Sequence, residues 1–193
     1  MRLFVLTRHG RSTLNAEGRI NGDPSVPGPL TAEGRAEAER LGRQLAQLPI
    51  DLCVHTRFPR TRETADVILA GREVPLLEVP LLDDIDVGDL EGDTIEAYEV
   101  WKRAHGRGDP FPGGESLDDA ARRYARAFRM LLDRAERTIL VVCHEIPVRY
   151  ALNAACGSDE LDRPDHSIPN ATPYLFDDVS LARAAAGIER LAG

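Results

Sequence analysis

Residues 138–143 (Thr-Ile-Leu-Val-Val-Cys) form an unbroken apolar run, and this run limits the possible folds more than any other feature of the chain. Such a run is typical of a strand buried on both faces, which occurs in parallel sheets covered by helices. Residues 3–6 and 51–55 are similar short runs, and the apolar residues of 33–45 recur at helical spacing. We therefore predict an α/β fold, a three-layer α/β/α sandwich with a mostly parallel central sheet, in a single domain over residues 1–193.

The remaining segments fit the same alternation of strands and helices. Residues 74–82 are extended and broken by prolines, which indicates an edge strand or a connector. We expect an amphipathic helix over 94–105, with Tyr98 and Trp101 as core aromatics, and further helices from Ser116 and Glu145. A polar loop containing His166 and a strand over 172–176 follow, and the residues after Val179 are compatible with either a helix or an edge strand.

The composition is that of an ordinary soluble globular protein with an acidic balance. A formal net charge of −8 argues against nucleic acid and anionic membranes as partners. We expect a cytoplasmic protein, because no segment resembles a signal peptide or a membrane span. The cysteines, Cys53, Cys143 and Cys156, have no metal-ligand spacing, so we predict reduced and mostly buried thiols.

Two histidines and a group of arginines are predicted at one edge of the sheet. Arg8 and His9 follow the first strand and His144 follows the central strand, where open α/β sheets bind ligands. A lone histidine at such a place is more often structural, but two at the same edge are candidates for one site. Arg60 and its neighbouring arginines begin a helix and oppose its macrodipole, a conflict that a bound anion would resolve.

Several ordered motifs resemble those of the histidine phosphatase superfamily, the group that includes the cofactor-dependent phosphoglycerate mutases. They cover most of the chain to about Asn170, and together they are specific although none is so alone. The matching segments are residues 7–15 (Thr-Arg-His-Gly-Arg-Ser-Thr-Leu-Asn), 30–34 (Leu-Thr-Ala-Glu-Gly), 56–65 around Arg60, 82–92 ending in Glu91-Gly92, and 112–116 with the later Cys143-His144.

The resemblance implies a role for each of several residues. His9 would be the nucleophile that becomes phosphorylated, and Arg8, Asn15 and Arg60 would bind phosphate oxygens. His144 matches the second histidine of the superfamily. The remaining matches are Asn21 and Gly22, which would lie near the phosphate, Asp84, which aligns with the general acid, and residues 112–116, which would line the pocket edge.

Several positions depart from the superfamily pattern. Asp84 stands where Glu is usual, which leaves its efficiency as an acid open, and Leu90 replaces an aromatic residue. Glu145 replaces the usual glycine, and we expect its side chain to narrow the pocket or to disfavour acidic substrates. Only one helix and one loop separate Asp84 from Glu115, whereas mutases usually carry a long insertion there; this favours the phosphatase branch.

We therefore expect a phosphatase that hydrolyses small phosphomonoesters through a phosphohistidine on His9. The scheme requires no cofactor and no metal, and its partner is a small phosphorylated metabolite. A cofactor-dependent phosphoglycerate mutase and a catalytically weak phosphate-binding protein are the alternatives. The sequence leaves open the physiological substrate, for which Ile20 and the Arg107 loop are candidate determinants, and the oligomeric state, a homodimer included.

Overall fold

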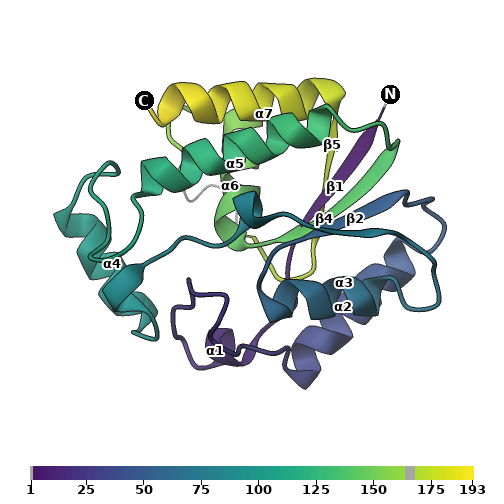
Figure 1. The fold of residues 1–193 in the computed structure, drawn as a ribbon, viewed down its shortest axis with the longest axis horizontal. Helices are drawn as coiled ribbons and strands as arrows, with labels where there is room; N and C mark the ends of the chain where they lie inside the picture. Colours follow the sequence, from purple (N-terminus) through teal and green to yellow (C-terminus); the bar gives the residue numbers. More distant parts are fainter. Residues whose placement is uncertain (1, 164–167) are drawn as a thin grey trace.

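The computed structural model describes residues 2–163 and 168–193, so His166 lies outside the described residues (Figure 1). The strands are β1 (Leu3–Arg8), β2 (Leu52–His55), β3 (Leu76–Glu78), β4 (Thr138–Cys143) and β5 (Pro173–Asp177). The helices are α1 (Thr13–Ala16), α2 (Ala32–Gln44), α3 (Pro59–Ile68), α4 (Ile95–Ala104), α5 (Leu117–Leu132), α6 (Glu145–Ala155) and α7 (Asp178–Leu191), with short 3₁₀ turns η1 (Pro80–Leu82) and η2 (Gly88–Leu90).

The sheet is mostly parallel, as predicted. Its strand order is β3-β2-β4-β1-β5, with β4 in the centre and β3 at one edge. Strands β1 to β4 pair in parallel, and only β5 runs antiparallel, beside β1. This order places the carboxyl ends of β1, β2 and β4 next to one another, which is what brings the two histidines to one edge.

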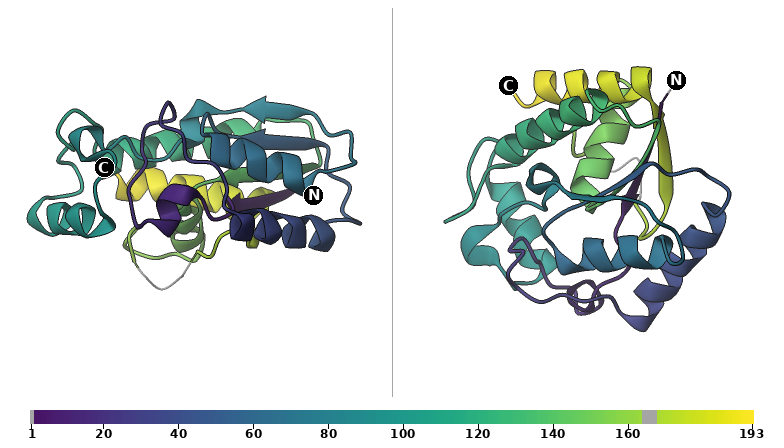
Figure 2. Two further views of the ribbon diagram at one scale, coloured as in Figure 1. Left: turned by 90° about the horizontal axis from the view of Figure 1, so that it is seen from below. Right: turned by 45° about the vertical axis from the view of Figure 1, so that its right-hand side comes forward.

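Helices cover both faces of the sheet, which confirms the three-layer sandwich (Figure 2). Alternate residues of each strand point to opposite faces. On β1, Phe4 and Leu6 pack in a core with α5, α6 and α7, whereas Val5 packs in a second core with α2 and α3. Strand β4 divides in the same way and is fully buried, as its continuous apolar sequence requires.

Side-chain caps fix where several helices begin. Thr31 Oγ1 accepts a hydrogen bond from Gly34 N at 3.0 Å, and Ser116 caps α5 in a capping box. The open question after Val179 is settled by α7, which Asp177 caps through Ser180 N at 2.8 Å. The apolar residues of α7 recur at helical spacing and are buried, mainly against α5 and α6, which explains why a helix forms there.

Two glycines allow the site-forming segments to approach one another. A Cβ on Gly10 would collide with the backbone of Gly34, and a Cβ on Gly22 would collide with the carbonyl of Ile85. The loop that carries Asn21 is therefore packed directly against the segment that carries Asp84. Glycine at these two positions is a condition for bringing the segments together.

The structure also shows the state of the cysteine thiols and the character of the helices. The thiols of Cys53, Cys143 and Cys156 are free, and the first two are buried, as predicted. Across residues 2–163 and 168–193, none of the helices combines the length and the apolar character that a bilayer crossing needs.

Candidate functional site

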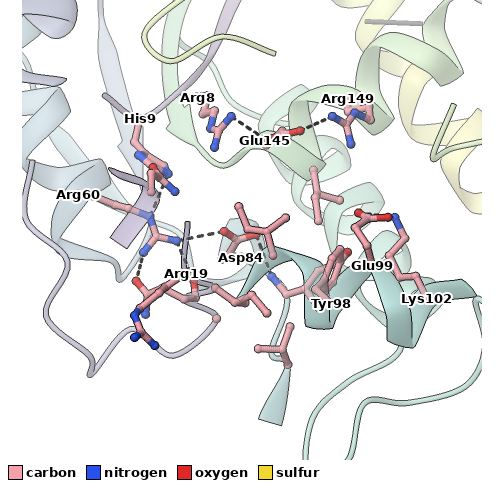
Figure 3. Close-up of a pocket in the computed structure, with 18 of the residues that line it drawn as sticks. Arg8, His9, Arg19, Arg60, Asp84, Tyr98, Glu99, Lys102, Glu145 and Arg149 are labelled. Atoms are coloured by element: carbon pink, nitrogen blue, oxygen red, sulfur yellow. Dashed lines mark hydrogen bonds and ion pairs between the residues drawn. The ribbon is translucent and has the colours of Figure 1, made fainter. Parts of the chain in front are cut away.

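A pocket of about 190 Å³ opens at the carboxyl edge of the sheet (Figure 3). Most of the residues that the sequence singled out meet there: Arg8, His9, Asn15, Asn21, Gly22, Arg60 and Asp84 line it. His144 lies fully buried immediately behind them, with its ring centroid 5.5 Å from that of His9. The predicted convergence of these segments on one cavity is therefore present in the structure.

His9 is held in one orientation and one tautomer. Its side chain is buried, and Nδ1 lies 2.7 Å from the carbonyl oxygen of Gly10. Because a carbonyl only accepts, Nδ1 carries the proton and Nε2 keeps its lone pair. The Asn170 amide donates to the His9 carbonyl at 2.7 Å and fixes the backbone. Burial, and then the charges of Arg60 and Arg8, hold the pKa of His9 well below its usual 6.5, so the ring is neutral.

Arg60 contacts most of the other polar side chains of the site. It is 3% exposed and stacks on the Phe58 ring at 4.2 Å. Its Nε donates to His9 Nε2 at 3.0 Å, while Nη1 and Nη2 donate to the side chain and backbone oxygens of Asn21. Nη2 also lies 3.1 Å from Asp84 Oδ2. A buried, fork-shaped cation is thus aimed at the ring nitrogen with the free lone pair.

Thr64 joins the helix of Arg60 to the strand of His9. Its hydroxyl donates to the Arg60 carbonyl at 2.6 Å and accepts from Gly10 N at 3.0 Å. The Thr-Ala pair four residues after Arg60, visible in the sequence as a pattern, therefore fixes the distance between α3 and the end of β1.

Glu91 organises the Asn21 loop, a function that sequence reasoning did not assign. Its carboxylate accepts from Gly22 N at 2.6 Å, from Asp23 N at 3.0 Å and from Asn21 Nδ2 at 2.9 Å. The amide of Asn21 is thereby turned so that its oxygen faces Arg60. The Glu91-Gly92 motif draws attention to Glu91 in the sequence, but it does not indicate that Asn21, Gly22 and Asp23 are its hydrogen-bond partners.

The Asp84 carboxyl lies beside Arg60 and His144 in the pocket. It is 25% exposed, and Oδ2 is 3.3 Å from His144 Nδ1. Burial raises the pKa of Asp84, against the opposing effect of Arg60. The carboxyl can therefore keep a proton at a higher pH than an ordinary aspartic acid.

His144 is neutral in this environment. Burial, and then Arg60 and His9, hold its pKa well below 6.5. Arg60 Nη2 lies 3.2 Å from Nδ1, so Nδ1 is the acceptor and Nε2 carries the proton toward Thr56 Oγ1 at 3.0 Å. Thr56, four positions before Arg60, thus holds the second histidine. A bound phosphate dianion would raise the pKa of this ring.

The outer half of the pocket comes mainly from α4 and α6. Ile95, Tyr98 and Lys102 line it from α4, and Glu145 and Arg149 line it from α6. Tyr98 was expected in the core; it does pack on Phe111, with ring centroids 5.6 Å apart, but it also faces the cavity. The sequence shows that α4 is amphipathic, yet it does not show which side of the helix meets a pocket.

Two expectations are corrected by the structure. Gly113, Gly114 and Glu115 line a second cavity beyond Asp84 instead of the edge of the first. The guanidinium of Arg57 also lies there and pairs with Asp83 at 2.5 Å. Arg107 pairs with Asp118 at 2.9 Å and with Asp162, so its charge is used to hold the loop. Ile20, the other predicted specificity residue, does line the pocket.

Arg62 and His55 have structural partners outside the pocket. Arg62 pairs with Asp66 at 3.0 Å on an exposed face, and His55 is buried with Nδ1 2.8 Å from the Thr56 carbonyl. In the described ranges, no three His, Cys, Asp or Glu side chains are grouped closely enough to hold a metal ion.

Comparisons with known proteins place the chain in a family. Residues 4–177 match the histidine phosphatase superfamily (branch 1), and the chain belongs to that superfamily. A 2,3-bisphosphoglycerate-dependent phosphoglycerate mutase from a Methylobacterium species is 35% identical over 194 residues, covering 91% of this chain and 90% of the mutase.

Solved structures show the same fold. YhfR of Bacillus stearothermophilus superposes with a TM-score of 0.80 at 27% identity, covering 91% of this chain and 90% of YhfR. The alpha-ribazole phosphatase of Shigella flexneri superposes with a TM-score of 0.72 at 25% identity, covering 81% and 80%. Similarity thus extends to relatives named both as mutases and as phosphatases.

Proposed function

We propose that this protein is a phosphatase that hydrolyses small phosphomonoesters, with His9 as the nucleophile. One observation carries the proposal: the unprotonated Nε2 of His9 lies 3.0 Å from the Arg60 guanidinium, and Arg60 in turn contacts Asp84. A nucleophile, an anion-binding group and a proton donor therefore share one small pocket.

Binding would place the phosphate between Arg60 and Arg8. In this structure Arg60 donates to His9 Nε2 and Asn21, and a phosphate oxygen would replace Nε2 as the acceptor of its Nε proton. Asn15, Asn21 and Gly22 line the same pocket. The N–H groups of Asn21 and Gly22 donate to Glu91 and the Asn21 oxygen accepts from Arg60, so these two residues shape the subsite and hold Arg60 in place. Guanidinium donors suit phosphate oxygens because they are planar, forked and permanently charged.

In the first chemical step, His9 Nε2 attacks phosphorus and the bond to the leaving oxygen breaks. Asp84, whose pKa is raised by burial, gives its proton to that oxygen. Arg60 and Arg8 stabilise the charge that develops on the phosphoryl oxygens. His144 adds to this when the bound dianion raises its pKa and the ring takes up a second proton. Splitting the reaction through a covalent intermediate replaces one difficult step by two easier ones.

In the second step, water attacks the phosphohistidine. The Asp84 carboxylate now takes a proton from the water, the bond between phosphorus and Nε2 breaks, and inorganic phosphate leaves. The proton returns Asp84 to its starting form, and His9 regains its free lone pair. The carbonyl of Gly10 holds Nδ1 throughout and keeps the ring in line.

A phosphoglycerate mutase is the second candidate, favoured by the names of curated relatives such as the Methylobacterium mutase. The short segment from Asp84 to Glu115, which contains only η2, α4 and a loop, favours the phosphatase. The carboxylate of Glu145 in the pocket also favours it, because phosphoglycerates carry a carboxylate of their own.

One assay separates the candidates. The purified protein is incubated with a panel of phosphomonoesters, and inorganic phosphate release is measured beside 2,3-bisphosphoglycerate-dependent isomerisation of phosphoglycerates. A phosphatase releases phosphate from several esters, and the Asp84→Asn variant loses most of that turnover. Isomerisation that outpaces hydrolysis would establish the mutase. Negligible turnover with intact phosphate binding would establish a binding protein.

A further inference from the structure

Glu145 holds an unusual position for an acidic residue beside a phosphate site. It is the first residue of α6, directly after His144, and its carboxylate lines the pocket. Oε2 lies 2.6 Å from Arg8 Nη1, and Oε1 pairs with Arg149 one helical turn later. Figure 3 shows the three side chains in a row along one side of the pocket. An anion is thus built into the wall that receives an anionic substrate.

The charged side chains of the inner pocket carry a net charge that is equal and opposite to that of one phosphate dianion. Arg8, Arg60 and Arg149 are positive, and Glu145 is negative. Asp84 is uncharged when it holds the proton that the leaving group needs. A dianionic phosphate brings this set to neutrality, so a further carboxylate on the leaving group would leave an uncompensated negative charge in a partly buried pocket.

The outer pocket offers little positive charge to compensate such a group. Lys102 Nζ lies 3.8 Å from Glu99, and Arg19 lies 3.6 Å from Glu17. The remaining surface there is partly apolar, from Ile20, Ile95, Tyr98 and Ile146. A leaving group in this region therefore meets already paired charges and hydrocarbon.

We propose that Glu145 is a specificity-determining residue that restricts the enzyme to phosphomonoesters whose alcohol portion carries no further negative charge. The proposal rests on the proposed phosphatase function. It assigns Glu145 two effects: its charge repels a second anion on the substrate, and its ion pairs occupy Arg149 and one nitrogen of Arg8, which could otherwise attract that anion. Substrates with a neutral, partly apolar alcohol are the class that fits.

Two esters that differ in one group test this directly. Glycerol 3-phosphate and 3-phosphoglycerate share a three-carbon skeleton, and a neutral hydroxymethyl in the first replaces the carboxylate of the second. We expect the wild-type kcat/KM to favour the neutral ester by about tenfold or more, because the carboxylate of Glu145 repels a second carboxylate bound in the same pocket. In Glu145→Gln, which keeps size and removes charge, the preference should fall by about tenfold through a gain on the acidic ester.

Glu145→Asp is the matched control, since it keeps the charge and should keep the preference for the neutral ester. A ratio near one in the wild type, or an unchanged ratio in Glu145→Gln, overturns the proposal. Circular dichroism checks folding of each variant, and if Glu145→Gln does not fold, the wild-type ratio decides.

Failure of the phosphatase function itself would appear differently, as an absence of hydrolysis of both esters. In that case calorimetry compares binding of propylphosphonate and 3-phosphonopropionate to the wild type. Binding of the neutral-tailed phosphonate that is about tenfold tighter supports the selectivity of the site, and equal or weaker binding overturns it.

Discussion

Replacing Arg60 with lysine tests how far catalysis depends on a fork-shaped donor at this position. The guanidinium contacts His9, Asn21 and Asp84 through three different nitrogens, and the side chain is 3% exposed. A lysine ammonium keeps the charge, but as a compact group it cannot reach these partners together or donate two parallel hydrogen bonds to a phosphate.

The expected loss follows from the bonds removed. Hydrogen bonds that involve a charged group contribute about 1.5–3 kcal/mol each, so losing two to the transferring phosphoryl group costs about 3–6 kcal/mol. This corresponds to a fall in kcat/KM of about 10²–10⁴-fold. The substitution also leaves two buried oxygens of Asn21 without their donor. This should lower the free energy of unfolding by about 1–3 kcal/mol, measured by urea denaturation.

Arg62→Lys is the matched control for this experiment. Arg62 lies two residues further along α3, is about half exposed and pairs only on the surface with Asp66. Its replacement should change the free energy of unfolding by less than about 0.5 kcal/mol and leave kcat/KM within about twofold. The reasoning about Arg60 is wrong if Arg60→Lys retains kcat/KM within about threefold of the wild type.

Three further predictions address the proton donor, the loop and the second histidine. Burial raises the pKa of Asp84 and lowers that of His9, so at acidic pH Asp84 is protonated while His9 is neutral. We therefore expect kcat to fall as the pH rises through the Asp84 pKa. Asp84→Asn should remove this pH dependence together with most of the activity. A pH profile of kcat that is flat in the wild type would contradict this. Glu91→Gln weakens the bonds to Gly22 and Asn21 and should raise KM about three- to tenfold, with a loss of about 1–2 kcal/mol in urea denaturation; an unchanged KM would show that the loop does not depend on that charge. Thr56→Val removes the partner of His144 Nε2 and should lower kcat about tenfold, whereas Thr56→Ser should restore it; equal rates for the two variants would exclude the positioning role.

The sequence predicted the parts of the site that depend on strand ends. The run at 138–143 is apolar because β4 is buried on both faces, and this burial gives its position in the sheet and hence the place of His144. Arg8 and His9 follow from the same reasoning on β1. The arginines at the start of α3 oppose its macrodipole and so indicate an anion site, but only the resemblance to the superfamily motif singles out Arg60 among them.

The outer pocket could not be predicted, since it depends on how α4 packs beside the sheet. Tyr98 is apolar enough for a core and also borders the cavity, and its spacing within the helix does not distinguish the two. Glu91 is similar: its partners lie about seventy residues earlier in the chain, at Asn21 and Gly22. Glu145 and Arg149 on α6, and Glu99 and Lys102 on α4, pair at spacings of four and three residues, which is the kind of contact that a helical sequence can show directly.

The most direct test of the central claim is to trap the covalent intermediate. The protein is mixed with a ³²P-labelled phosphomonoester, quenched rapidly in alkali, and digested, and the labelled peptide is sequenced by mass spectrometry. We predict a phosphoryl group on the His9 peptide that is stable in alkali and labile in acid. The label should disappear in His9→Ala and remain detectable in His144→Ala. A label on His144, or hydrolysis at full rate by His9→Ala, would contradict it.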